Sequence, residues 1–362
     1  RQRQMCIRDR DCSLMGIDIL PPDINNSFSN FVVNSQNQIE YGLAALKDVG
    51  TKFVEEVCLQ RQSGPFKNLM DFASRVDLRK GGIRALQSLA KSGAFDGICE
   101  RDLAISSIRN YLEASEQKFK SKESGVMEMF DSNEDLKVAK LEITNFSDSE
   151  KLKMELESFG FYFSQHPISL LRPTLSSRLK PINRLNTTNS EKFLPVLINH
   201  KRVVRKGSNI FVFLEVSDET GVIDVSVPNE LYEEKRNEFK ENKVVMIKGT
   251  VSADDYRREN LEDVGIKVRA TDIMSIDSSR ALVTSYIRLI LPMNSLKTLA
   301  NGSFKQFEEL NSPNGVDVML EFKDTEKNLS TEIKVDSFRI SLEDSTFEKL
   351  NKLIGEGNYT LF

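Results

Sequence analysis

Residues 193–277 restrict the possible folds more than any other part of this chain. Five runs there have the apolar and polar alternation of β-strands, and one run between them has helical spacing. The expected strands are Phe193–Arg205, Asn209–Val216, Val222–Val227, Lys243–Val251 and Val264–Ile276, and the expected helix is Asn229–Lys240. Glycines at Gly207-Ser208 and Glu219-Thr220-Gly221 suit hairpin turns, because glycine tolerates a positive φ. This order predicts a small closed Greek-key barrel.

Barrels with this order of elements, the OB type, present a face that binds single-stranded nucleic acid. Cations lie at the loops that border this face: Lys201, Arg202, Arg205 and Lys206 at the end of the first strand and its turn, and Arg257 and Arg258 between the fourth and fifth strands. Alternation predicts Lys201 and Arg205 on one face of the strand and Arg202 and Lys206 on the other. Cations in both loops favour contact with a phosphate backbone, although Asp254, Asp255 and Glu259 dilute the second group.

Two aromatic residues of the second strand, Phe211 and Phe213, alternate and therefore share one face. They either stack on bases from outside or fill the barrel. Aromatic side chains are more often core than contact surface, so we expect both to fill the barrel.

The length of 362 residues predicts two to four compact units. No apolar run approaches the roughly 20 residues that a membrane span needs, and no signal peptide opens the sequence. Four scattered cysteines and only two histidines argue against a zinc site and favour reduced cytosolic thiols. Residues 41–95 carry nine Lys/Arg against five Asp/Glu and residues 301–362 seven against twelve, which suggests separate partners for the two ends.

Ile39–Arg61 has the pattern of a helix, a tight turn and a second helix, and its turn "LKDVG" resembles the hairpin of helix-hairpin-helix DNA-binding units. In such units the turn leaves backbone N–H groups free at the start of the second helix, where a phosphate docks. Lys47 and Lys52 flank the turn. Asp48 stands where a first glycine is usual; aspartate can adopt the left-handed conformation, but its charge weakens the attraction for phosphate.

A second helical pair is predicted over residues 78–97, with its turn at Ser92-Gly93-Ala94-Phe95. Two such pairs would form a four-helix module that contacts the duplex backbone, and the alternative is a helical bundle whose glycines only cap helices. We favour the DNA contact. The candidate residues are Lys47, Asp48, Val49, Gly50, Lys52, Ser92 and Gly93.

The middle of the chain is polar apart from a short apolar cluster, "VMEMF", at residues 126–130. Such a cluster in a linker either anchors in the hydrophobic pocket of a partner or folds back onto its own core; the residues alone favour folding back. Further along, the aromatic residues Phe161, Tyr162 and Phe163 are expected in the core. His166, before Pro167, is expected to have a structural role.

Several segments, taken in order, resemble the C-terminal third of the alpha subunits of bacterial DNA polymerase III, the C-family replicative polymerases. They are "MGIDILPPDINNS", "YGLAALKDVG", "SGAFD", "ESFGFYFSQHPI", the barrel with "VSVPNELYEE", and "FRISLEDSTFEKLNKLIGEGN". The first ten residues, "RQRQMCIRDR", do not fit the family; they resemble translated sequencing-adapter read-through and are treated as a non-native artefact.

The resemblance implies a multidomain α+β chain. Its parts are the end of the fingers domain (residues 11–40), a tandem helix-hairpin-helix module (41–98), a helix and linker (99–192), an OB-fold (193–277) and a small α/β C-terminal domain (281–362). It implies that Val126, Met127, Glu128, Met129 and Phe130 form the peptide that binds the sliding clamp (beta), although the usual first residue is glutamine. The other implied partners are primed and single-stranded template DNA and the clamp-loader tau subunit, in the replisome of the bacterial cytoplasm and away from membranes.

The resemblance also implies a DNA-directed DNA polymerase as the parent protein. In that family, three palm carboxylates hold two Mg²⁺ ions, and these motifs would precede Asp11. No catalytic residue, metal site or cofactor is therefore expected in this part, and Asp23 lies in the wrong module. Two alternatives are a non-catalytic DNA-binding scaffold built from the same modules and an error-prone paralogue, although such paralogues typically lack the tau-binding end.

Overall fold

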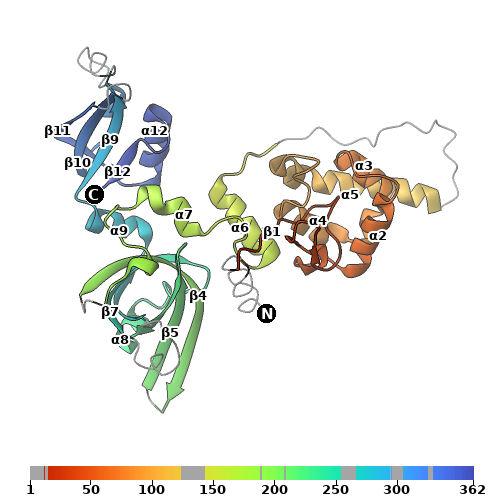
Figure 1. Cartoon of the computed structure of the whole chain (residues 1–362), viewed down its shortest axis with the longest axis horizontal. Coiled ribbons are helices and arrows are strands. Elements are labelled where there is room, and N and C mark those ends of the chain that lie inside the picture. Colours follow the sequence, from red (N-terminus) through yellow and green to blue (C-terminus); the bar gives the residue numbers. More distant parts are fainter. Residues whose placement is uncertain are drawn as a thin grey trace. The chain divides into compact units, whose positions relative to one another are not determined.

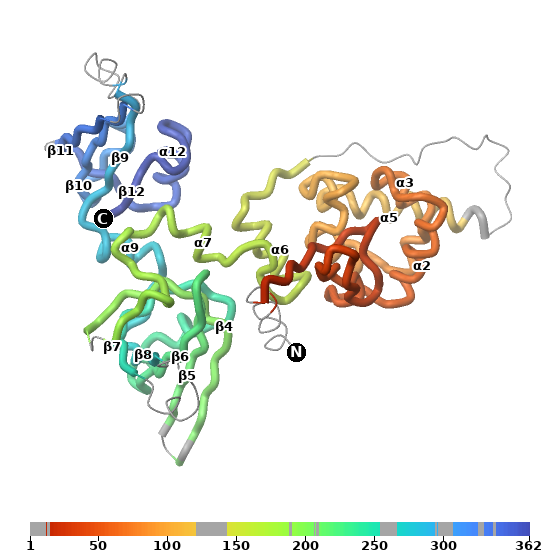
Figure 2. Tube along the Cα trace, viewed as in Figure 1, coloured from red at the N-terminus to blue at the C-terminus, as the bar shows by residue number. Residues whose placement is uncertain are grey.

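The computed structural model describes residues 12, 15–123, 143–187, 190–207, 209–253, 266–293, 295, 305–324 and 329–362. Contacts divide the chain into two compact units, Arg1–Gln165 and His166–Phe362 (Figures 1 and 2). The first is mainly helical, and the second combines a closed barrel with a four-stranded sheet. The predicted multidomain α+β class is confirmed.

The first unit opens with three short strands: β1 (Ile19–Leu20), β2 (Val32–Val33) and β3 (Ile39–Glu40), in the order β1-β3-β2. Between β1 and β2, the Asn25 side chain binds the backbone of Phe66 twice. Its Oδ1 accepts from the Phe66 N–H at 2.7 Å and its Nδ2 donates to the Phe66 carbonyl at 2.9 Å. The "PPDIN" segment is therefore hydrogen-bonded to the loop that follows the helix Thr51–Arg61.

Five helices follow: α2 (Thr51–Arg61), α3 (Leu69–Arg75), α4 (Gly82–Lys91), α5 (Arg101–Glu123) and α6 (Asp148–Phe159), with 3-10 turns η1 (Leu43–Ala45) and η2 (Leu78–Lys80). The helix predicted before the first hairpin turn is wrong, because β3 and the three-residue η1 stand there instead. The backbone of Gly42 is extended, and a Cβ on it would lie 2.7 Å from the backbone of Asn30. Close tertiary contact therefore overrides the local helical spacing.

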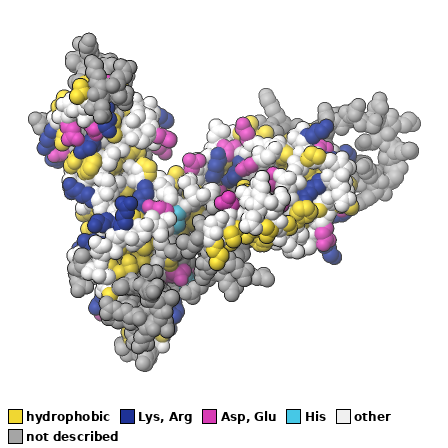
Figure 3. Space-filling model, in the orientation of Figure 1, with side chains coloured by type: hydrophobic (Ala, Val, Ile, Leu, Met, Phe, Trp, Pro, Cys, Tyr) yellow, Lys and Arg dark blue, Asp and Glu magenta, His cyan; other side chains and the backbone are white. Residues whose placement is uncertain are grey.

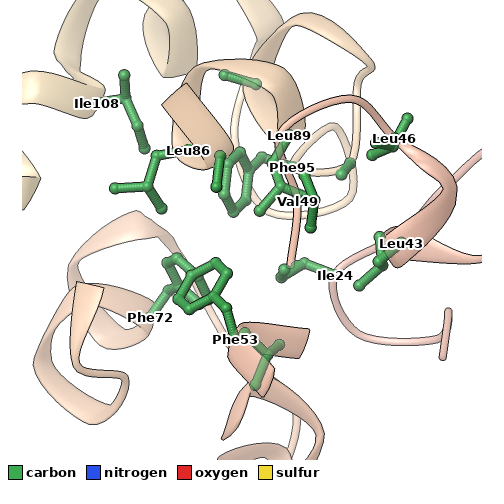
Figure 4. Packing of buried hydrophobic residues seen from close by; sticks show 14 of the residues in the cluster. Ile24, Leu43, Leu46, Val49, Phe53, Phe72, Leu86, Leu89, Phe95 and Ile108 are labelled. Atoms are coloured by element: carbon green, nitrogen blue, oxygen red, sulfur yellow. The ribbon is translucent and has the colours of Figure 1, made fainter. Parts of the chain in front are cut away.

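The core of this unit is rich in phenylalanine (Figure 4). The Phe72 ring meets the Phe66 and Phe95 rings edge-on, with centroids 5.1 and 5.2 Å apart. Phe161 is buried in the same core and Phe163 packs against it, as predicted for both. Helix α6 ends at Gly160, whose φ of +89° is the left-handed conformation that glycine accepts easily.

In the second unit, α7 (Pro167–Leu171), η3 (Arg172–Thr174) and η4 (Ile182–Arg184) precede the barrel. The barrel strands are β4 (Glu191–Lys206), β5 (Asn209–Ser217), β6 (Val222–Val227), β7 (Val244–Ala253) and β8 (Ile266–Met274), closed in the order β4-β5-β6-β8-β7. All five predicted strands are confirmed. The helix between them, α8 (Asn229–Glu234), is shorter than predicted, and Phe239 beyond it is fully buried in the barrel core.

A small α/β part completes the second unit. It contains α9 (Ile276–Val283), β9 (Tyr286–Pro292), α11 (Lys305–Glu308), β10 (Asn311–Asp324), β11 (Leu329–Ile340), α12 (Asp344–Ile354) and β12 (Tyr359–Leu361). Its sheet has the order β11-β10-β9-β12, and Phe347 and Leu350 of α12 belong to its core. Within the described ranges, no helix combines the length and the apolar character required to cross a membrane.

Candidate nucleic-acid interface

The first hairpin turn presents the start of α2 to solvent. Asp48 has a φ of +62°, so the aspartate does take the left-handed conformation of the usual glycine. Val49 is buried and anchors the turn, whereas Asp48, Gly50 and Lys52 are exposed. Among the described residues, no acceptor bonds the N–H groups of Gly50, Thr51 or Lys52. These amides lie at the positive end of the helix, which is the geometry that receives a phosphate oxygen.

The two lysines of this turn differ in their contacts. The Lys47 Nζ donates to the Leu156 carbonyl at 3.2 Å, and the Lys47 N–H donates to the Ser158 carbonyl at 2.9 Å, so this residue caps the end of α6. Lys52 is exposed and forms no ion pair with any described residue. Lys52 is therefore the cation of the turn whose charge is available to a ligand.

The second predicted turn lies inside the fold. Ser92 and Gly93 are buried, and the Ser92 hydroxyl donates to the Leu89 carbonyl at 2.9 Å. Gly93 has a φ of +80°, and a Cβ there would collide with the Arg101 guanidinium. These contacts leave no side-chain atom of Ser92 for a phosphate.

The exposed counterpart of the first turn is the start of α4, which our sequence reasoning missed. Gly81 must approach the Phe53 ring, since a Cβ would lie 2.8 Å from it, and Gly82 has a φ of +69°. Lys80 and Arg84 on either side are exposed, although the Lys80 Nζ lies 3.0 Å from Glu56. The signal was present in the sequence as "RKGG", a glycine directly before a helix, like the "DVG" of the first turn.

The barrel presents two aromatic rings on its outer wall. Phe211 is 44% exposed and Phe213 36%, whereas Val212 and Leu214 are 1% and 0% exposed. The prediction that both phenylalanines fill the barrel is therefore wrong. The reason is alternation: the aliphatic side chains between them already occupy the interior, so the rings point outward.

A row of side chains crosses the outer wall at Phe213. The strand register places Phe213 beside Arg202 of β4 and beside Ser226 of β6, and Ser226 beside Arg269 of β8. The Arg202 guanidinium lies over the Phe213 ring, 5.2 Å from its centroid. We call Arg202, Phe211, Phe213, Ser226 and Arg269 the outer row. It combines aromatic rings with exposed cations, the composition of single-strand binding surfaces.

The other predicted cations have different positions. Lys201 and Arg205 pair with Leu214 and Ile210, on the opposite side of the strand from Arg202, as predicted. The Lys201 Nζ donates to the Phe239 carbonyl at 2.9 Å, so this lysine is bound to its own barrel, whereas Arg205 is exposed. Lys206 occupies a strand position on the side of Arg202. Its side chain lies outside the described residues, as do Arg257, Arg258 and residues 126–130.

The β4–β5 hairpin extends beyond the barrel wall (Figure 1). The first three residues of β5, at 209–211, pair with β4 but have no partner on β6. The ring of Phe211 therefore stands on a projecting ribbon with its outer face open.

His166 has the structural role that was predicted. Its Nδ1 accepts from the Ile168 N–H at 3.1 Å and caps α7, and its Nε2 lies 3.0 Å from the Ser217 Oγ. The Ser217 hydroxyl in turn donates to Asn199 Oδ1 at 2.9 Å, at the β-bulge of β4. Burial lowers the pKa of His166 to about 4. Across the described ranges, no three His, Cys, Asp or Glu side chains form a group able to hold a metal ion.

Two known domain families match parts of this chain. The helix-hairpin-helix motif family matches residues 16–103, and the OB-fold nucleic acid binding domain family matches residues 197–276.

Curated relatives cover most of the chain. The DNA polymerase III subunit alpha of Pasteurella multocida is 30% identical over 297 residues, which is 79% of this chain and 25% of the relative. The corresponding subunit of Haemophilus influenzae is 30% identical over 315 residues, 84% of this chain and 26% of the relative. That of Vibrio cholerae is 24% identical over 367 residues, 97% of this chain and 30% of the relative. The chain thus spans about a quarter of the length of these relatives.

Proposed function

Starting from the homology of this chain to the C-terminal region of the DNA polymerase III subunit alpha, we propose that it is the DNA-holding and partner-binding part of a replicative polymerase. The parent protein would extend a primed template from deoxynucleoside triphosphates, with Mg²⁺ at palm carboxylates outside this sequence. The part described here would hold the DNA and attach the enzyme to other replication proteins.

The outer row of the barrel carries this proposal. Phe211 and Phe213 offer two ring faces to unpaired bases, and each base stacked on an aromatic ring contributes about 1–3 kcal/mol. Arg202 and Arg269 stand on either side of Phe213 in the same row, where they would meet the phosphates. Stacking tolerates any base, so this surface would hold a template strand without reading its sequence.

The helical unit would contact duplex DNA through its backbone. The starts of α2 and α4 both follow a glycine and both carry an exposed cation, Lys52 and Arg84. Free amides at two helix starts would bind phosphate oxygens without base contacts. Asp48, exposed beside the first start, would reduce the strength of that contact.

The protein partners follow from the family resemblance. Residues 126–130 would dock in the sliding clamp, with Met129 and Phe130 as apolar anchors. The α/β part from β9 to β12 would bind the clamp-loader tau subunit.

Single-strand binding by the full chain tests the outer row. We expect Phe213→Ala to weaken the binding of a labelled oligo(dT) roughly 5-fold to 150-fold, because one stacked base is lost. The matched control is Phe28→Ala, which removes an exposed ring in the other unit (48% exposed, against 36% for Phe213). The measurement is fluorescence anisotropy at fixed salt. Equal affinities of the two variants would show that Phe213 stacks on no base.

A further inference from the structure

A basic segment of the second unit has no role in the function proposed above. Arg172–Arg184, with the sequence "RPTLSSRLKPINR", contains four cations and no Asp or Glu, in a chain whose net charge is −4. It precedes the barrel and includes η3 and η4. We call it the pre-barrel segment.

The pre-barrel segment is held rigidly on both sides. Leu175 is buried against Met246 and Ile276, and Ile182 is buried in the barrel core. The Ser177 N–H donates to the Leu361 carbonyl at 2.8 Å, which ties the segment to β12. The backbone that carries these cations is already ordered, so a ligand has to order only their side chains.

The four cations fall into two groups. Arg172 is paired with Asp218 at 3.2 Å and with Glu219 at 2.6 Å, so it is part of the internal structure. Arg178, Lys180 and Arg184 are exposed, and among the described residues no carboxylate lies within ion-pair distance of any of the three. Among the described residues, these three side chains have one polar partner, and it is neutral: the Arg178 Nη1 donates to the Ser285 Oγ at 3.2 Å. Figure 3 shows Lys and Arg side chains gathered on this part of the surface, near α7 and α9.

Three like charges without counter-charges favour an anionic ligand. The three charges add to one local positive potential, which a polyanion neutralises, and the counterions released from the polyanion add favourable entropy. A chain with a regularly repeated negative charge is the kind of ligand that could meet several of these cations at once.

The pre-barrel segment lies at one end of the β5 strand that carries the aromatic rings. The Ile182 N–H donates to Asp218 Oδ2 at 2.7 Å and the Asn183 N–H to Thr220 Oγ1 at 3.2 Å, so the segment contacts the turn directly after β5. Phe213 is four residues from the end of β5, which corresponds to about 13 Å along an extended strand. A nucleic-acid strand that leaves the outer row in this direction would reach the segment within a few nucleotides.

We propose that Arg178, Lys180 and Arg184 form a second contact for the sugar-phosphate backbone of the single strand held on the outer row. The inference rests on the proposed single-strand function and extends it, because it lengthens the bound strand beyond the barrel wall. Bases are not read at this second contact.

A length series of oligonucleotides tests the proposal on the full chain. We compare oligo(dT) of about 6 nucleotides, which a single barrel can hold, with oligo(dT) of about 25 nucleotides. The test variant carries Arg178→Gln, Lys180→Gln and Arg184→Gln together. We expect its affinity for the long oligonucleotide to fall roughly tenfold and its salt slope by about 2, since each lost phosphate contact removes about 0.7. Binding of the short oligonucleotide should weaken much less, because few of its nucleotides extend beyond the outer row.

Two control variants separate the effect of these three positions from the effect of a lower net positive charge. Lys240→Gln, Lys349→Gln and Lys352→Gln together remove the same charge from exposed positions of the same unit that have no ion pair among the described residues. This triple variant should bind both oligonucleotides like the wild type. The charge-preserving variant with Arg178→Lys and Arg184→Lys should keep most of the salt slope, because a backbone contact needs charge rather than guanidinium geometry.

The possible outcomes distinguish a failure of the second contact from a failure of single-strand binding by the outer row. Equal losses in the two glutamine variants, or a wild type that gains no affinity between the short and the long oligonucleotide, would overturn the second contact. A wild type that binds only the long oligonucleotide, with binding abolished in the test variant, would show a phosphate contact at the pre-barrel segment alone and would refute both the outer row and the proposed continuous path.

Discussion

The partly buried His166 gives a prediction about acid stability. Its Nδ1 accepts the Ile168 N–H, so the imidazole proton is on Nε2 and faces Ser217. Protonation of Nδ1 would place two N–H groups against each other and put a charge in a partly desolvated site. Desolvation is the main cause of the lowered pKa; Asp218 and Glu219 oppose it and Arg172 reinforces it.

The size of the effect follows from the pKa of about 4, against 6.5 for a free imidazole. Between these values the unfolded chain binds the proton more readily than the folded chain. The free energy of unfolding therefore decreases as the pH falls. At 1.36 kcal/mol per pKa unit, the second unit should lose about 3 kcal/mol between pH 6.5 and pH 4 because of this residue alone. Below pH 4 the loss from this group is complete.

Two measurements check this prediction. The chain has only two histidines, so the imidazole resonances can be assigned with His200→Gln and His166 followed through a pH titration by NMR. Urea unfolding of the second unit is then compared with that of His166→Asn, which keeps a capping side chain but does not titrate. The difference between the two pH profiles should be about 3 kcal/mol across this window. A His166 pKa near 6.5, or parallel stability profiles, would refute the reasoning.

Three further predictions concern single side chains. Asn25→Ala should destabilise the first unit by about 2 kcal/mol in urea unfolding, because both hydrogen bonds to Phe66 are lost. Asn25→Asp keeps the acceptor and should destabilise the unit less. Equal losses of stability in the two variants would contradict this account. Arg280→Ala should destabilise the second unit by about 3 kcal/mol, since the buried Arg280 guanidinium joins Asp277 of α9 to Asp344 of α12. An unchanged thermal midpoint of unfolding would disprove this prediction. Phe130→Ala should weaken clamp binding by about 2 kcal/mol in a titration with the sliding clamp, and an unchanged affinity would remove the clamp assignment.

The barrel was predictable because its signals are local. Alternation, turn glycines and strand length can each be read from a few neighbouring residues. The observed strand ends differ from the predicted ones by no more than two residues wherever the end is described. The first hairpin was less predictable. Gly42 adopts an extended backbone because the chain at residues 29–31 packs against it, and no pattern near Gly42 contains that information.

The direction of the β5 side chains shows a different limit. Alternation correctly indicates that Phe211 and Phe213 share a face, but Val212, Leu214 and Val216 on the other face are equally apolar. A strand with two apolar faces does not indicate which one is inside. The closed barrel decides, because the aliphatic face of β5 packs with the other strands and Phe239 in the interior, which leaves the two β5 rings outside. An apolar outer face on a strand therefore indicates a contact surface only after the interior has been located.

The cations show why a binding site cannot be read from charge alone. Lys47 and Lys201 belong to the predicted basic groups, yet backbone carbonyls of their own units accept from both ammonium groups. Arg269 was not predicted, and it stands in the outer row because β8 pairs with β6 in parallel. Sequence position determines where a charge can reach, and the hydrogen bonds of the folded chain determine whether it is free to bind. For this reason the cations of the outer row and of the pre-barrel segment, rather than the lysines with internal partners, should determine the salt dependence of DNA binding.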